Sequence, residues 1–165
     1  MKKAIFLDRD GVINKKKDDY VKSVDELEIF SFTAESIKKI NRMGYLTIVV
    51  TNQSAIHRGL LTHDSLKKIH NMIQNHLNNE FAHIDAFYYC PHLPSENCKC
   101  RKPKTGQIEQ ALSDFDIDLK NSWVIGDSES DMEVGRTMNC YTLKIDEKFN
   151  LSNAVDYIMN NRHLR

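Results

Sequence analysis

The sequence lacks long apolar runs and has no excess of charge of either sign. Of its 165 residues, 23 are Lys or Arg and 23 are Asp or Glu, so the formal net charge is +0. This balance argues against broad electrostatic capture of nucleic acid or of an anionic membrane, although it permits a small local anion site. No stretch approaches the about 20 apolar residues of a membrane-spanning helix. We therefore expect no nucleic-acid partner and no membrane partner.

The N-terminus also lacks the features of an export signal. The stretch MKKAIFLDRDG starts with basic residues, but it becomes charged again directly after AIFL. That apolar run is too short for the core of a signal peptide. We therefore expect a cytoplasmic protein, in which clustered cysteines are expected to be metal ligands rather than disulfides.

No internal repeat and no linker rich in Pro, Gly or Ser divides the chain. The length suits one domain with one core, so we expect a single domain over residues 1–165, acting as a monomer. The phosphate-loop pattern G-x-x-x-x-G-K-[ST] is absent as well, which argues against a P-loop kinase.

Short apolar runs alternate with helical patterns along the chain. The predicted strands are 4–8, 45–51, 86–90, 122–127 and 140–145, and the predicted helices are 33–44, 62–81, 105–116, 128–139 and 151–161. Continuous apolar runs are typical of strands that are buried on both faces of a parallel sheet. The pattern predicts an α/β three-layer sandwich with a mainly parallel, Rossmann-like sheet. In such folds ligands bind beyond the carboxyl ends of the strands.

The stretch FLDRDGVIN places two carboxylates at the end of the first predicted strand. Asp8 and Asp10 follow the apolar run directly, and Gly11 comes next. Residues two apart can project in the same direction as the chain leaves a strand. Two nearby carboxylates can bind a hard cation, or divide the roles of nucleophile and acid–base catalyst. Taken alone, the motif fits an Asp-Gly turn with two solvated acids equally well.

The stretch CPHLPSENCKC is a compact set of metal-ligand side chains. Cys90, His92, Cys98 and Cys100 form a Cys₃His set that suits tetrahedral Zn²⁺. Four protein ligands leave no position for a substrate, so a zinc ion at 90–100 would be structural. Unmetallated thiols beside a surface histidine are the alternative. Cys140 lies outside the cluster and is expected to pack in a strand.

Four motifs, taken in order, resemble the signatures of the haloacid dehalogenase-like phosphatases: DRDG, TNQS, the Lys of CRKPK, and GDSESD. The resemblance covers nearly the whole chain. Within the family, YVKSVDELEIF, TNQSAIHRG and the cysteine loop followed by RKP are similar to the heptose 1,7-bisphosphate 7-phosphatase and histidinol-phosphate phosphatase group. TNQSAIHRG favours the heptose enzymes, which would place the chain in the synthesis of precursors for lipopolysaccharide or another surface polysaccharide. The resemblance implies a phosphomonoesterase with a minimal cap.

The resemblance also implies a role for each catalytic side chain. Asp8 would be the nucleophile that forms an aspartyl-phosphate, and Asp10 would protonate the leaving group and then deprotonate water. Thr51 and Lys102 would contact the transferring phosphoryl group. An ordinary strand-to-loop turn is the alternative interpretation of Thr51.

Mg²⁺ is the implied catalytic cofactor, because it prefers oxygen ligands. The implied ligands are the Asp8 carboxylate, the Asp10 backbone carbonyl and Asp127. Asp131 is expected to contact the metal ligands without binding the ion itself, or to bind at an alternative metal position. A cap cluster at a helix N-terminus is the alternative for Asp127 and Asp131.

The basic pair after the last cysteine of the loop links the two metal sites. Arg101 and Lys102 follow Cys100 directly, so we expect zinc to hold these cations over the phosphate. A solvated pair of surface cations is the alternative.

The expected partner is a small phosphorylated sugar. The candidate substrate contacts are Asn52, Gln53, Ser54, Arg101, Asp18, Asp19 and Tyr20. Of the histidines, His57 is a lesser candidate, and His63, His70 and His76 are expected on a helix surface. The segment 14–21 departs from the heptose-enzyme pattern by one extra residue and a run of Lys, which bears on substrate identity. Histidinol phosphate, a DNA 3′-phosphate and a catalytically silent zinc-binding module remain as alternative functions.

Overall fold

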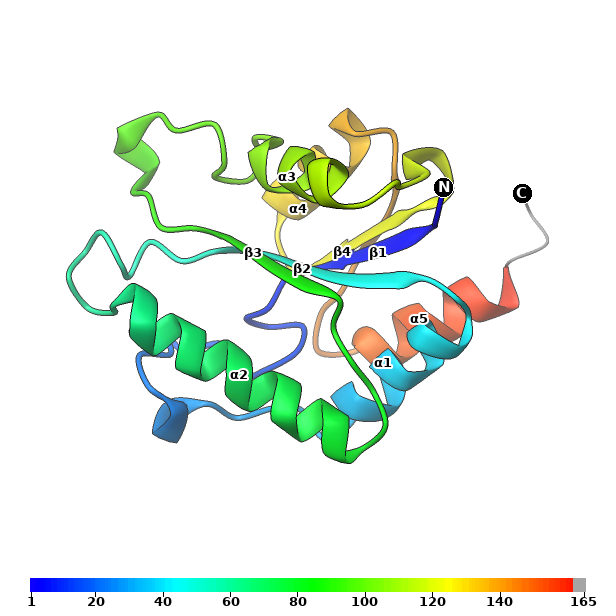
Figure 1. Ribbon diagram of the computed structural model, residues 1–165, viewed down its shortest axis with the longest axis horizontal. Coiled ribbons are helices and arrows are strands. Elements are labelled where there is room, and N and C mark those ends of the chain that lie inside the picture. The colour runs from blue at the N-terminus through cyan, green and yellow to red at the C-terminus, as the bar shows by residue number, and fades with distance from the viewer. Residues whose placement is uncertain (162–165) are drawn as a thin grey trace.

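The computed structural model describes residues 1–161, which form a five-stranded parallel sheet with helices on both faces (Figure 1). The strands are β1 (Ala4–Leu7), β2 (Leu46–Asn52), β3 (Ala86–Cys90), β4 (Trp123–Gly126) and β5 (Tyr141–Lys144). The helices are α1 (Thr33–Arg42), α2 (His63–Asn79), α3 (Gly106–Asp114), α4 (Glu129–Thr137) and α5 (Leu151–Asn160). Every predicted element is present, and the predicted fold class is confirmed.

The sheet lies between two helical layers. Helices α1, α2 and α5 cover one face, and α3 and α4 cover the other (Figure 1). Strand β1 contributes to both cores: Ile5 and Leu7 pack with the first layer, whereas Ala4 and Phe6 pack with the second. Because side chains alternate along a strand, a strand covered on both faces must be apolar throughout. This is why the strands read as continuous apolar runs. Within residues 1–161 no helix combines the length and the apolar character needed to cross a membrane.

The strand order places the ends of β1 and β4 together. The order is β3-β2-β1-β4-β5, so the chain winds outward from β1 in one direction and from β4 in the other. Leu7 pairs with Ile125 in this register, and the backbone N–H of Asp8 donates to the Ile125 carbonyl at 3.0 Å. The first residues beyond the two strands, Asp8 and Asp127, are therefore neighbours. Such a reversal point is where ligands bind in open α/β sheets.

Candidate active site

Three carboxylates meet at the reversal point of the sheet. Asp8 follows β1, Asp127 follows β4, and Asp131 lies in the first turn of α4. One oxygen from each lies within 4.8 Å of the others. Gly11 lets the Asp127 carboxylate lie close to the backbone after β1. The φ of Gly11 is +85°, and a Cβ atom there would lie 2.4 Å from Asp127 Oδ2.

Lys102 places an ammonium group between two of these carboxylates. Its side chain is 3% exposed, and Nζ donates to Asp8 Oδ1 at 3.1 Å and to Asp131 Oδ1 at 2.6 Å. Nζ also donates to the Val50 carbonyl at 2.7 Å. Burial by itself lowers the pKa of Lys102, but the two carboxylates outweigh this effect and raise it. Lys102 is therefore held as a cation beside Asp8.

The environment of Asp8 makes ionisation less favourable than for an ordinary aspartate, and further positive charge would favour ionisation. Burial raises the pKa of Asp8 to about 7; Lys102 acts in the opposite direction, and Asp131 raises the pKa further. Three carboxylates face the buried ammonium of Lys102 and the more exposed ammonium of Lys16, whose Nζ lies 3.4 Å from Asp127 Oδ2. An excess of negative charge remains, which a bound cation would balance. Among residues 1–161, buried Asp127 Oδ1 has no hydrogen-bond partner. An orphaned carboxylate oxygen within a set of oxygen donors fits Mg²⁺.

Asp10 has the opposite environment. Its Oδ1 accepts from Arg9 Nη2 at 2.9 Å and from Asn14 Nδ2 at 3.0 Å, and its Oδ2 accepts from Gln53 Nε2 at 2.9 Å. Burial raises the pKa of Asp10, but the Arg9 charge and these hydrogen bonds outweigh burial and lower it. Asp10 is therefore held as a carboxylate whose oxygens are fixed in place.

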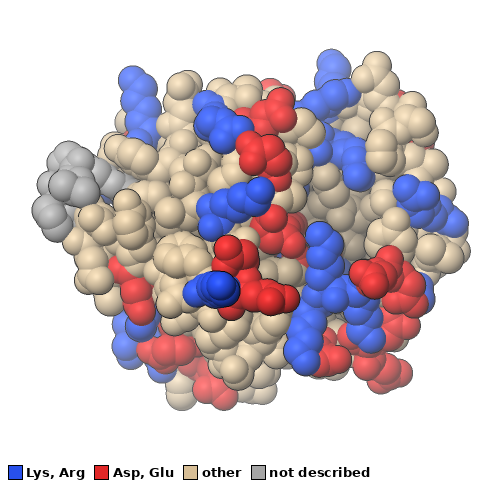
Figure 2. Space-filling view, turned by 180° about the vertical axis from the view of Figure 1, so that it is seen from behind, with Lys and Arg blue, Asp and Glu red and all other residues tan. Residues whose placement is uncertain are grey.

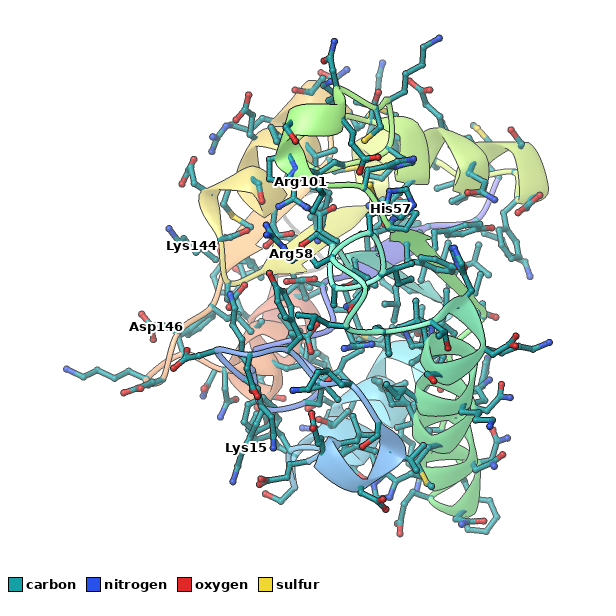
Figure 3. The ribbon with its side chains drawn as sticks, turned by 90° about the vertical axis from the view of Figure 1, so that its left-hand side faces the viewer. Lys15, His57, Arg58, Arg101, Lys144 and Asp146 are labelled. Carbon is teal, nitrogen blue, oxygen red and sulfur yellow. The ribbon has the colours of Figure 1, made fainter. Side chains whose placement is uncertain are left out.

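These carboxylates lie in a cavity of about 430 Å³ with a cationic rim. Loops rather than a further layer of helices border it, and its lining cations are Lys16, Lys17, Arg58, Arg101 and Lys102. Figure 3 shows Arg58 and Arg101 next to each other over the carboxyl ends of the strands. The face in Figure 2 carries basic and acidic side chains interspersed, so neither sign of charge dominates that face.

Most of the predicted substrate contacts line this cavity. The residues that do so are Asn52, Gln53, Ser54, Arg101, Asp18 and Tyr20. Asp19 does not: its side chain is 79% exposed and pairs with Lys22 at 2.8 Å. Thr51 is buried behind the lining, where its hydroxyl accepts from Gln53 Nε2 at 2.8 Å. His57 pairs with Glu96 at 2.8 Å instead of lining the cavity.

The ligand atoms of the predicted zinc cluster converge. Those of Cys90, His92, Cys98 and Cys100 all lie within 4.8 Å of one another, and the thiols are free. His92 Nδ1 lies 3.3 Å from Cys90 Sγ and 3.2 Å from Cys100 Sγ. The cluster also contacts the basic pair, since Arg101 donates its backbone N–H to Cys98 Sγ at 3.3 Å and its Nη1 to the His92 carbonyl at 3.3 Å. This donor set fits Zn²⁺.

Comparison with known proteins shows the family of this chain. A family model described as HAD-hydrolase-like matches residues 99–147. The chain is 37% identical over 136 residues to D-glycero-beta-D-manno-heptose-1,7-bisphosphate 7-phosphatase of Pseudomonas aeruginosa, covering 82% of this chain and 76% of the relative. The chain belongs to the haloacid dehalogenase-like phosphatase family. It is also 40% identical over 141 residues to D-glycero-alpha-D-manno-heptose-1,7-bisphosphate 7-phosphatase of Campylobacter jejuni, covering 86% of this chain and 80% of the relative.

A solved structure of another haloacid dehalogenase-like phosphatase is similar over nearly the whole fold. This is D,D-heptose 1.7-bisphosphate phosphatase from B. bronchiseptica, complexed with magnesium and phosphate. The TM-score is 0.89 at 27% identity, covering 96% of this chain and 99% of that chain. That relative therefore binds both a divalent cation and a phosphate on the same fold.

The phosphatase site also contains residues that sequence reasoning missed. Lys16, Lys17 and Arg58 line the cavity from loops, where no periodicity marks them. His70 was expected on a helix surface, but this expectation is wrong, since His70 is 7% exposed and its Nε2 lies 3.2 Å from Arg9 Nη1. A signal for its burial was present: His70 lies four residues after Leu66 and three before Ile73, on the apolar face of α2.

Proposed function

We propose that this phosphatase is magnesium-dependent and removes the 7-phosphate of D-glycero-D-manno-heptose 1,7-bisphosphate. One observation carries the chemistry: carboxylate oxygens of Asp8, Asp127 and Asp131 within 4.8 Å, with Lys102 Nζ 3.1 Å from Asp8. The names of the two relatives and of the B. bronchiseptica enzyme support the substrate. The relatives differ in the anomer that they name, so both anomers belong in the test.

The reaction divides into two displacements at phosphorus. Asp8 attacks the 7-phosphate; the new bond joins its oxygen to phosphorus, and the bond from phosphorus to the sugar oxygen breaks. The leaving oxygen takes a proton from the Asp10 carboxyl group. Water then attacks the phosphorus of the aspartyl-phosphate and gives a proton to Asp10. The bond from phosphorus to the Asp8 oxygen breaks, which releases inorganic phosphate and restores the Asp8 carboxylate. Asp10 begins as a carboxylate, and the arriving phosphate dianion favours its protonation because like charges raise a pKa.

Charge repulsion is the main barrier to attack by a carboxylate on a phosphate ester. Mg²⁺ at the Asp8 carboxylate, the Asp10 carbonyl and Asp127 would supply positive charge against the phosphoryl oxygens. Lys102, in the segment after the cysteine loop, supplies a second positive charge next to the nucleophile, since its Nζ contacts Asp8. Asp131 holds that ammonium in place at 2.6 Å.

The cationic rim suits a substrate that carries a second phosphate. Lys16, Lys17, Arg58 and Arg101 line the cavity in addition to the catalytic Lys102. A planar guanidinium such as that of Arg101 can bind two oxygens of one phosphate. We assign the 1-phosphate to this rim.

Zinc in the cysteine loop would act through the positions of Arg101 and Lys102 and would not itself contact the substrate. The cluster Cys90, His92, Cys98 and Cys100 contacts Arg101 through two hydrogen bonds, at 3.3 Å each. Zinc would order the loop that carries Arg101 and Lys102, because so short a segment has little core of its own.

A substrate panel tests the proposal. Phosphate release is measured with magnesium from both anomers of the heptose bisphosphate, from histidinol phosphate and from an oligonucleotide 3′-phosphate. We expect preference for a heptose bisphosphate, loss of release in Asp8→Asn, and normal release in Asp19→Asn, whose side chain lies outside the cavity. Preference for histidinol phosphate or the oligonucleotide would refute the substrate. No release from any ester would leave the silent zinc-binding module as the better account.

A further inference from the structure

A buried chain of contacts runs from helix α2 to the acid–base carboxylate. Arg9 lies between Asp8 and Asp10, yet its side chain is 0% exposed, which is unusual for Arg. Its Nη2 donates to Asp10 Oδ1 at 2.9 Å, and its Nη1 lies 3.2 Å from His70 Nε2. Among residues 1–161, Arg9 Nε has no hydrogen-bond partner. The orientation of the guanidinium therefore depends on Asp10 at one tip and His70 at the other.

The direction of the second contact follows from the chemistry of the groups. A guanidinium group has only donors, so His70 Nε2 must accept. The imidazole is therefore neutral, with its proton on Nδ1. The ring is also held in its plane, since it stacks on Phe87 of β3 at 4.5 Å and 18°. His70 is thus a fixed acceptor for Arg9 rather than a surface residue.

We propose that Arg9 is a positioning residue for Asp10 and that His70 fixes Arg9 in its productive orientation. This inference rests on the proposed function, because it concerns the proton that Asp10 gives to the leaving group. Without the His70 acceptor, the guanidinium is free to turn, and Asp10 Oδ1 loses a donor that holds its direction. Asn14 and Gln53 still hold Asp10, so the loss is partial.

The test compares two phosphate esters. A sugar phosphate leaves as an alkoxide and needs a proton from Asp10, whereas p-nitrophenyl phosphate leaves as a stable phenolate and needs little. The ratio kcat/KM reports the steps through formation of the aspartyl-phosphate. In His70→Leu we expect kcat/KM to fall about tenfold for the sugar phosphate and less than about threefold for the aryl ester. The loss should lie in kcat rather than in KM, since His70 does not line the cavity.

Three further variants separate positioning from simple damage to the fold. His70→Gln retains an acceptor for Arg9 and should recover most of the lost activity. Arg9→Lys keeps the charge but cannot reach both partners, so it should repeat the ester-dependent loss even if His70→Leu folds poorly. His76→Leu, on an exposed position of the same helix, should leave both esters unaffected.

These measurements distinguish failure of the proposed function from failure of the positioning role of Arg9 and His70. If the wild-type protein hydrolyses neither ester, the proposed function fails and this role fails with it. If the wild-type protein is active but His70→Leu and Arg9→Lys slow both esters by the same factor, only the positioning role is overturned.

Discussion

Replacing Lys102 tests the electrostatic account of the site most directly. The side chains of Lys102 and Asp131 are 3% and 1% exposed, and that of Asp8 is 15% exposed. Lys102→Met keeps much of the apolar stem and removes the ammonium. Two largely buried carboxylates then face each other without the cation that now lies 2.6 Å from one and 3.1 Å from the other.

The size of the effect follows from burial. Removing one partner of a buried ion pair costs about 3–5 kcal/mol of unfolding free energy. Because Asp8 is partly exposed, we expect the lower end, about 3 kcal/mol. At about 2–4 °C per kcal/mol for a chain of this length, Tm should fall by roughly 6–12 °C. Since Lys102 lowers the pKa of Asp8, its removal raises that pKa, and the destabilisation should shrink as the pH is lowered and the carboxyl group takes up a proton.

Thermal and urea unfolding in magnesium-free buffer measure this effect, with phosphate release measured in parallel. Lys144→Met is the matched control, because that side chain is 53% exposed and lies 3.7 Å from Glu129; it should change stability by less than about 0.5 kcal/mol. The double variant Lys102→Met with Asp131→Asn should be more stable than Lys102→Met alone, since one uncompensated charge is gone. Equal stability of Lys102→Met and Lys144→Met, or a double variant less stable than the single one, would refute the reasoning.

Three other predictions follow from named contacts. Zinc removal, or Cys98→Ser, should raise KM for the bisphosphate while leaving phosphorylation of Asp8 possible; metal-free protein that keeps its fold and full kcat/KM would contradict this. Burial, and then the charge of Arg9, lower the pKa of His70 from 6.5 to about 3, so below pH 6.5 the unfolded chain takes up a proton that the folded protein does not. The unfolding free energy should therefore fall with falling pH by up to about 1.4 kcal/mol per pH unit from this group. His70→Gln should flatten the slope in urea titrations, whereas a slope unchanged from that of wild type would count against it. Gly126→Ala should reduce both stability and turnover, because the new Cβ would lie 2.2 Å from the Asp131 carboxylate; wild-type values in both assays would contradict the model of the site.

The fold was predictable because its signals are local. Strands β1, β2 and β4 are short runs buried on both faces, whereas the edge strands β3 and β5 are partly exposed. Each helix has an apolar stripe, so most elements could be recognised without knowing their neighbours. In α2, Thr62 caps the first turn by accepting from the Ser65 N–H at 3.0 Å. Strand order has no such local signal, yet it decides that the segments ending at Asp8 and Asp127 meet.

Parts of the site were predictable from residue type and position in a motif: the carboxylates after a strand, the cysteines at metal-ligand spacing, and the side chains of Asn52, Gln53, Ser54 and Arg101 that line the cavity. Such residues can be recognised in the sequence. Lys16, Lys17 and Arg58 cannot, because a cation in a loop looks the same whether it faces solvent or a cavity. Asp19 shows the reverse error: it lies in the predicted substrate segment, but its side chain points to Lys22.

The different environments of the two carboxylates of the DRDG motif can be seen only in the folded structure. Asp8 and Asp10 are two residues apart and chemically identical, so the motif alone leaves their roles interchangeable. The structure separates them: burial beside Asp131 raises the pKa of Asp8 to about 7, whereas Arg9 and its neighbours lower that of Asp10. The groups responsible include residues from distant parts of the chain: Gln53 follows β2, Lys102 follows the cysteine loop, and Asp131 lies in α4. In the free site this order of pKa values is the opposite of the one that the proposed roles need, because a nucleophile must be ionised and a general acid must carry a proton. The proposed roles therefore require added positive charge, such as that of Mg²⁺, to favour ionised Asp8, and they require the incoming phosphate to favour protonated Asp10.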